Sequence, residues 1–153
     1  MKALRILCVI ALICGLAGLS FAEVAKRTAT ITDLKGKVEI RTSSGSWEAA
    51  KVGMTLTEGD IIMTKVDSTA TLNLSGTEEA SVSMKPNSQM ALAELVMDKK
   101  EGTQKTLLDL ALGEVLIKTQ KLHAKESKFE VKTPTSIVGV RGTAFSVAVE
   151  AVE

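Results

Sequence analysis

Apolar and polar residues alternate along the chain from Ala29 onward, with turn-forming residues at short intervals. A period of two is typical of β-strands, because successive side chains of a strand point to opposite faces. The apolar positions Leu72, Val82 and Leu92 recur at a spacing of ten. This spacing fits either a meander of hairpins or successive coils of a small solenoid. The pattern therefore predicts an all-β fold of short strands, either solenoid-like or of a meander or sandwich type.

Glycine and polar clusters predict where the strands end. We expect a turn at 33–36, two short strands within 47–64 around a corner at 58–60, and a charged hairpin tip or solvent loop at 98–104. Leu108, Leu110 and Leu112 alternate strictly, which favours a strand over a helix for 106–118. Gly113 then shifts the apolar register, as a bulge or corner does.

The first 22 residues differ from the rest of the chain. Lys2 and Arg5 precede an apolar run at 6–19, and the small residues Ser20 and Ala22 follow it. This arrangement is typical of a secretory signal cleaved before Glu23. A run of about 14 apolar residues is shorter than the roughly 20 that span a bilayer. We therefore expect a signal peptide at 1–22, one domain at 23–153, no stable membrane span after cleavage, and a periplasmic or secreted protein.

Composition argues against several classes of function. Without the signal, 17 basic residues remain against 18 acidic ones, which does not suit a nucleic-acid binder. Trp47 is the only tryptophan and tyrosine is absent, so there are few platforms on which bases or sugars can stack. His123 is the only histidine, and both cysteines lie in the signal. Neither a catalytic triad nor a zinc site is visible, so we expect no enzyme and no cofactor.

Asp60 and Arg141 are the charged residues most closely flanked by turn glycines and strand residues. Gly139 and Gly142 surround Arg141 and allow positive φ or a close backbone approach there. One interpretation makes Asp60 and Arg141 a recognition point for a partner. The favoured interpretation is structural: the Arg141 guanidinium caps carbonyls or pairs with an acid and holds the C-terminal corner.

Trp47 also has two interpretations. It is either a partly buried staple over the Gly45 loop, covered by Met54, Leu56 and Ile61, or an exposed anchor at an interface; the staple is favoured. The serine and threonine residues at 69, 71, 81 and 83 fit the solvated face of a sheet, and a β edge there would accept a partner strand.

Four segments together resemble the FecR domain of bacterial envelope proteins: Gly36 to Val38, the stretch 47–64, Leu112 to Val115, and the C-terminal segment 132–145. The resemblance covers roughly residues 30–149 and implies a solenoid-like all-β body. In family members that regulate iron-citrate-type uptake, a cytoplasmic segment contacts a sigma factor and a membrane helix precedes the periplasmic region. Here a signal is expected in place of both parts.

The resemblance implies an exported, non-catalytic domain that binds an envelope protein or another ligand, including a sensory or signalling accessory role. The alternative is a structural β module that assembles with its own copies or scaffolds a surface complex. The matching residues resemble fold-defining corners, so the family suggests no binding residue.

Overall fold

The computed structural model describes residues 23–43, 45–76, 79–119, 127–140 and 143–150 of the 153-residue chain. These residues form 13 strands and no helix, which confirms the all-β prediction. The strands are β1 (Val24–Lys26), β2 (Ala29–Lys35), β3 (Val38–Arg41), β4 (Trp47–Ala49), β5 (Thr55–Leu56), β6 (Ile61–Thr64), β7 (Thr69–Leu74), β8 (Ala80–Met84), β9 (Gln89–Asp98), β10 (Gln104–Thr119), β11 (Lys128–Lys132), β12 (Ile137–Val140) and β13 (Thr143–Val149).

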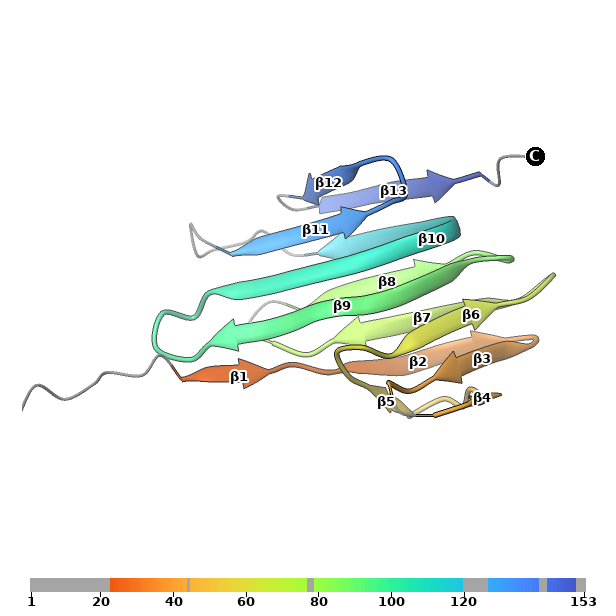
Figure 1. Ribbon diagram of the computed structural model, residues 1–153, viewed down its shortest axis with the longest axis horizontal. Helices are drawn as coiled ribbons and strands as arrows, with labels where there is room; N and C mark the ends of the chain where they lie inside the picture. Colours follow the sequence, from red (N-terminus) through yellow and green to blue (C-terminus); the bar gives the residue numbers. More distant parts are fainter. Residues whose placement is uncertain (1–22, 44, 77–78, 120–126, 141–142, 151–153) are drawn as a thin grey trace, which may run out of the picture.

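The strands form one curled sheet, a half-barrel whose two layers face each other (Figure 1). The first layer contains β1, β3, β4, β6, β9, β11 and β12, and the second contains β2, β5, β7, β8 and β13. The long strand β10 belongs to both layers. Its residues 104–112 pair with β9, and its residues 115–119 pair with β8.

Strand pairing distinguishes between the two predicted architectures. Among the described strands, only β10 and β11 pair in parallel, and all other pairs are antiparallel. The spacing of ten reflects this arrangement, since Leu72 lies opposite Val82 in the β7–β8 hairpin, whereas Leu92 lies in the other layer. Successive coils of a solenoid would pair in parallel. The fold is therefore a set of hairpins on a curled sheet, not a solenoid.

The core lies between the two layers and uses every second residue of the strands. Leu72, Val82 and Ile117 are fully buried neighbours in the second layer, and Leu92 and Leu108 are fully buried neighbours in the first. Each such side chain contributes about 1.5 to 3 kcal/mol by leaving water. The polar positions between them face outward, as expected for a solvated face; for example, the hydroxyls of Thr71 and Ser83 lie 3.3 Å apart on neighbouring strands.

Four of the crossings between the layers form a column of corners along one side of the molecule (Figure 1). The corners connect β2 to β3, β6 to β7 and β8 to β9, and the fourth lies within β10. Each has one residue with positive φ: Gly36 (75°), Asp67 (53°), Asn87 (55°) and Gly113 (89°). Glycine adopts this conformation at no steric cost, and aspartate and asparagine adopt it more readily than most other residues. We call these four corners the corner column.

Two serines connect successive corners. The hydroxyl of Ser68 accepts a hydrogen bond from the backbone N–H of Lys37 at 2.8 Å, and the hydroxyl of Ser88 accepts one from the N–H of Glu114 at 3.0 Å. Each serine lies against the glycine before its donor: a Cβ on Gly36 would collide with the Ser68 hydroxyl, and one on Gly113 would lie 2.5 Å from Ser88 Cα. The same Gly–Ser contact therefore occurs at two places in the column.

Backbone hydrogen bonds complete the corner column. The N–H of Lys65 donates to Lys37 O at 3.1 Å, the N–H of Asn87 donates to Lys65 O at 3.2 Å, and the N–H of Lys85 donates to Glu114 O at 2.9 Å. Buried Thr64 supports the middle of the column, since its hydroxyl donates to Lys85 O at 2.6 Å and accepts from the N–H of Ser88 at 3.0 Å. These bonds give hydrogen-bond partners to backbone N–H and C=O groups that would otherwise be buried unpaired at the crossings.

The turn predictions are correct in part. The hairpin tip at 98–104 is confirmed, because β9 ends and β10 begins there. The strand at 106–118 and the irregularity at Gly113 are also confirmed. The prediction of a turn at 33–36 is wrong. Strand β2 continues to Lys35 through a register shift, and only Gly36 has a turn conformation. The two short strands around the corner at 58–60 are confirmed as β5 and β6, but the stretch 47–64 also contains a third strand, β4, which pairs with β3 and was not predicted.

We expect Gly113→Ala to destabilise the protein more than Gly102→Ala. Both glycines have positive φ, which costs a side chain about 1 to 2 kcal/mol. At Gly102 an added Cβ meets nothing within 4 Å, whereas at Gly113 it collides with Ser88. Urea unfolding measures both free energies, and we expect the Gly113 variant to lose at least about 1 kcal/mol more than the control. Equal losses of unfolding free energy in the two variants would show that the contact between Gly113 and Ser88 does not exclude a side chain at this corner.

Candidate functional site

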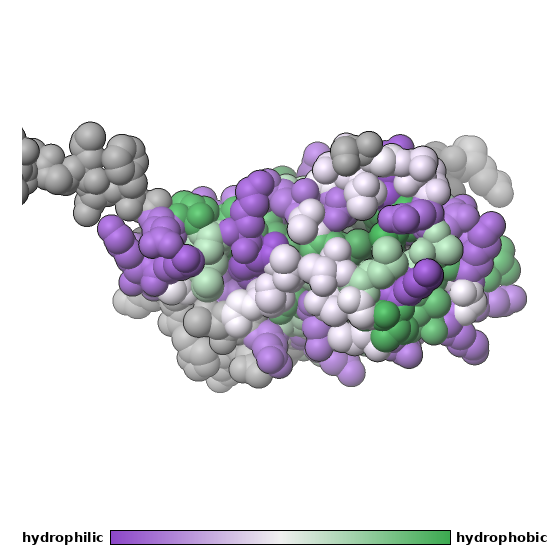
Figure 2. Space-filling model, turned by 90° about the horizontal axis from the view of Figure 1, so that it is seen from below, coloured by the Kyte–Doolittle hydropathy of each residue, from purple (hydrophilic) through white to green (hydrophobic). Residues whose placement is uncertain are grey.

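The two ends of the half-barrel are built differently. At the end formed by β4 and β5, the segment 50–54 covers the gap between the layers. The N–H of Ala50 donates to Val38 O in the first layer at 2.9 Å, and the N–H of Gly53 donates to Ile31 O in the second at 2.7 Å. Figure 2 views this side and shows hydrophilic side chains spread among the apolar ones. This end of the sheet is therefore closed by the chain itself.

At the opposite end, a groove of about 610 Å³ lies between the layers. It follows directly after Gly113, the last corner of the column. Within the described residues, no further crossing joins the turn after β11 to the end of β13. Leu112 and Val138 are 38% and 37% exposed at the groove. The groove is lined by Ala111, Leu112, Thr133, Pro134, Thr135, Ser136, Val138, Ser146, Val147, Ala148, Val149 and Glu150. It is an open site lined by apolar side chains together with hydroxyl groups and one carboxylate.

The strands beside the groove are edges of the sheet. In the part of the chain that the structure describes, β12 pairs only with β11, and β13 pairs only with β10. Neither strand contains a charged residue, and Ile137 of β12 is 63% exposed. The edges at the other end are shorter, and β4 carries Glu48. Proteins commonly protect edges by short length or charge, and the edges at the groove lack this charge.

Asp60 is a structural residue of the corner between β5 and β6. It is 4% exposed. Its Oδ1 accepts from the N–H of Ser43 at 3.0 Å, and its Oδ2 accepts from the N–H and hydroxyl of Thr57 at 2.7 and 3.2 Å. Both carboxylate oxygens thus bind this chain's own backbone. These contacts give Asp60 a structural role that does not require a binding partner.

Trp47 lies on edge strand β4, opposite Arg41 of β3. The Arg41 guanidinium carbon is 5.2 Å from the centre of the ring, within the range of a cation–π contact. The residue is 37% exposed, so the cover expected from Met54, Leu56 and Ile61 leaves over a third of it in solvent. Trp47 lies at the closed end and is not part of the groove.

The other predicted residues are distributed as follows. Gly139 is in β12, at the uncharged edge. Arg141 and Gly142 lie outside the described residues, as does His123, so the two interpretations of Arg141 stay predictions. Asp60 is at the first-layer corner after β5, so the structure brings Gly139 to the groove end but not Asp60.

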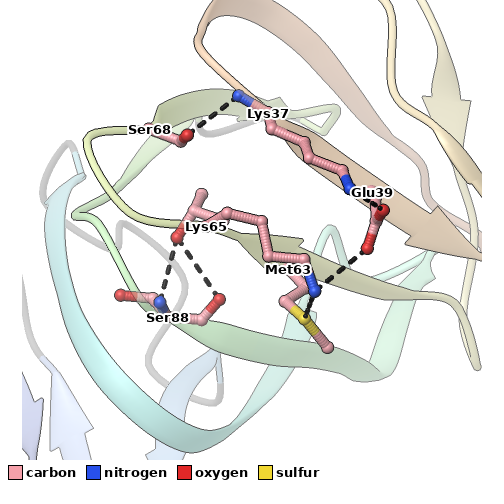
Figure 3. A network of polar contacts seen from close by, with 7 residues as sticks. Lys37, Glu39, Met63, Lys65, Ser68 and Ser88 are labelled. Atoms are coloured by element: carbon pink, nitrogen blue, oxygen red, sulfur yellow. Dashed lines mark hydrogen bonds and ion pairs between the residues drawn. The ribbon is translucent and has the colours of Figure 1, made fainter.

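Lys37, Glu39 and Lys65 form an ionic cluster on the outer face of the first layer beside the corner column (Figure 3). The Glu39 carboxylate lies 3.1 Å from Lys65 Nζ and 3.3 Å from Lys37 Nζ. Lys65 Nζ also donates to the Met63 sulfur at 2.9 Å. Hydrogen bonds from Lys65, and then from Lys37, lower the pKa of Glu39 from its ordinary value of 4.5. The cluster connects the first two corners by side chains as well as backbone.

Sequence reasoning did not identify Ser68, Ser88 or Arg27 as important. Arg27 is 4% exposed; its Nε donates to Ser75 O and its Nη1 donates to the Thr106 hydroxyl at 2.7 Å. A signal for the serines was present, because the tetrapeptides at 65–68 and 85–88 both have lysine first, aspartate or asparagine third and serine fourth. That repeat of 20 residues marks two equivalent corners.

No group of three or more metal-binding side chains occurs within the described ranges. Among the same residues, no helix is long and apolar enough to cross a membrane. Among the lining residues that the structure describes, Glu150 is the only one with an ionisable side chain. The groove therefore offers shape and apolar surface rather than reactive groups.

The family model described as FecR protein matches residues 60–152, which is more than half of the chain. This range includes β6 to β13, the last three corners of the column, and the groove. No curated protein and no solved structure matches the chain significantly.

We expect Asp60→Asn to lower the free energy of unfolding by about 1 to 3 kcal/mol, because one of the donors would then face an amide NH₂ instead of an oxygen. Chemical denaturation measures the loss. Asp67→Asn is the matched control, since its φ of 53° suits asparagine as well and Asn87 occupies the equivalent corner. An Asp60 variant as stable as the control would contradict the structural role.

Glu39 makes stability depend on acid pH. Because folding lowers its pKa, the ion pairs stabilise the folded state fully above the unfolded-state pKa near 4.5, and this stabilisation is lost as the pH falls through the lower folded-state value. We expect Glu39→Gln to be less stable than the wild type at neutral pH and to approach it in acid. Thermal unfolding across this pH range tests the effect, with Glu48→Gln on β4 as control. A difference that is constant with pH would show that the charge is not responsible.

Proposed function

The chain belongs to the FecR family, and we propose that it acts by binding another protein of the cell envelope, without catalysis. The FecR domain is associated with signalling in iron-uptake systems that use sigma and anti-sigma factors. The proposed role is that of a sensory or signalling accessory whose binding region is the open end of the half-barrel.

The groove is the observation that carries this proposal. It lies within the matched range and combines exposed Leu112 and Val138 with uncharged edge strands. A groove with exposed apolar residues beside a free edge suits an extended segment, which gains main-chain hydrogen bonds from the edge and apolar contacts from the groove. General acid–base chemistry usually needs a second positioned group besides a single carboxylate such as Glu150, which supports binding over catalysis.

We further propose that the protein is exported and that residues 1–22 are removed before Glu23. The support is the basic start, the apolar run and the small residues before the cleavage point. After cleavage, the protein would contain no cysteine, so that folding in an oxidising compartment would rest on the apolar core and the corner column.

Photocrosslinking in intact cells tests the proposal. A photoreactive residue at Leu112, inside the groove, is expected to capture a different envelope protein, identified by mass spectrometry together with the N-terminus of the captured chain. The same residue at Val52 is the control, because Val52 is 60% exposed and lies at the closed end. Val138→Glu should abolish capture at Leu112, because it places a charge in the groove.

Capture at Leu112 that equals capture at Val52, or that survives Val138→Glu in a folded protein, would contradict binding at the groove. An N-terminus that retains residues 1–22 would contradict cleavage of the signal.

A further inference from the structure

Strand β12 exposes an uncharged edge whose two faces differ. Val138 and Val140 lie opposite the buried residues Val131 and Phe129 of β11, so they share the core side of the first layer. Ile137 and Gly139 lie on the outer side, and Ile137 is 63% exposed. The two valines therefore lie on the core face, and Ile137 and Gly139 lie on the outer face. Another strand can extend the layer only in registers that place its own core-face residues beside the valines.

The edge is complementary to itself. In an antiparallel pair of two β12 strands with a two-fold axis at Val138, Val138 faces its own copy on the core side. Ile137 then faces Gly139 of the other copy on the outer side. A Cβ at Gly139 would meet nothing within 4 Å, so there is open space beside it for the isoleucine. Opposite residues in antiparallel strands are about 4.5 to 5.5 Å apart, close enough for this contact.

Pairing of the β12 edge of one copy with the β4 edge of another is less favourable than pairing of two β12 edges. The other end of the sheet is covered by segment 50–54, and its edge strand β4 carries Glu48 and the exposed Trp47. An apolar edge that met these residues would bury a carboxylate without a partner. A two-fold contact instead joins identical uncharged edges and closes after two copies.

We propose that the protein forms a two-fold symmetric dimer in which the β12 strands of two copies pair antiparallel about Val138. The partner is a second copy of this chain. The dimer pairs the β12 edges and continues the first layer across both copies, whereas the edge of β13 stays available for the envelope segment of the proposed function. This inference concerns the same open end as the proposed function but does not require the envelope partner.

Sedimentation equilibrium of the purified protein tests the dimer. The expected result is a concentration-dependent dimer that is lost in Gly139→Glu, because the new carboxylate would face Ile137 of the other copy. The backbone should accept a side chain here, since a Cβ at Gly139 meets no neighbour and its φ is not positive. Because Glu130 of β11 lies opposite Gly139, Gly139→Lys is a second variant that should also abolish the dimer but creates no pair of like charges with β11. Circular dichroism checks that each variant is folded. Thr55→Glu, on edge strand β5 at the closed end, should leave the dimer intact.

A wild-type protein that stays monomeric up to its solubility limit would overturn the proposal. A dimer that persists in folded Gly139→Glu, or that is equally lost in Thr55→Glu, would do the same. These measurements use one purified protein, whereas envelope capture at Leu112 requires a different protein. Failure of the dimer is thus distinguishable from failure of the proposed function.

Discussion

The structure depends on the four crossings between its two layers that form the corner column. A crossing removes peptide groups from regular strand pairing, and these groups need other partners when water is excluded. The corner column provides them through Ser68, Ser88 and Thr64, each of which bonds to backbone groups of a neighbouring corner. Gly36 and Gly113 make the close approach of the serines possible. Because each corner bonds to the next, the spacing and order of the layers are set together.

The sequence predicted the strands better than it predicted their neighbours. Strict alternation at Leu108, Leu110 and Leu112 identified a strand correctly, and Gly113 marked its irregular point. Alternation depends only on which side of a strand is buried, so it can be recognised locally. Whether hairpins or coils form depends on pairing between distant residues, such as Thr30 with Thr55, for which a single sequence has no direct signal.

The candidate site was less predictable for the same reason. Asp60 was found because glycine and turn residues surround it, but its contacts with Ser43 and Thr57 could not be deduced. Gly139 was selected for its conformational freedom, and the structure places it in edge strand β12, where an added Cβ would meet nothing within 4 Å. Edge position is a property of the whole sheet, and local composition does not reveal it.

The open end follows from where the corner column stops. Strand β10 passes from one layer to the other at Gly113, and it then has a free side in each layer. Strand β11 pairs with it in the first layer and β13 in the second, but the described residues contain no further crossing between them. Polar side chains therefore stabilise the column, while apolar residues such as Leu112 remain exposed beyond it. The residues that form the corner column are thus separate from those that line the groove, so the groove surface can change with little effect on the corners.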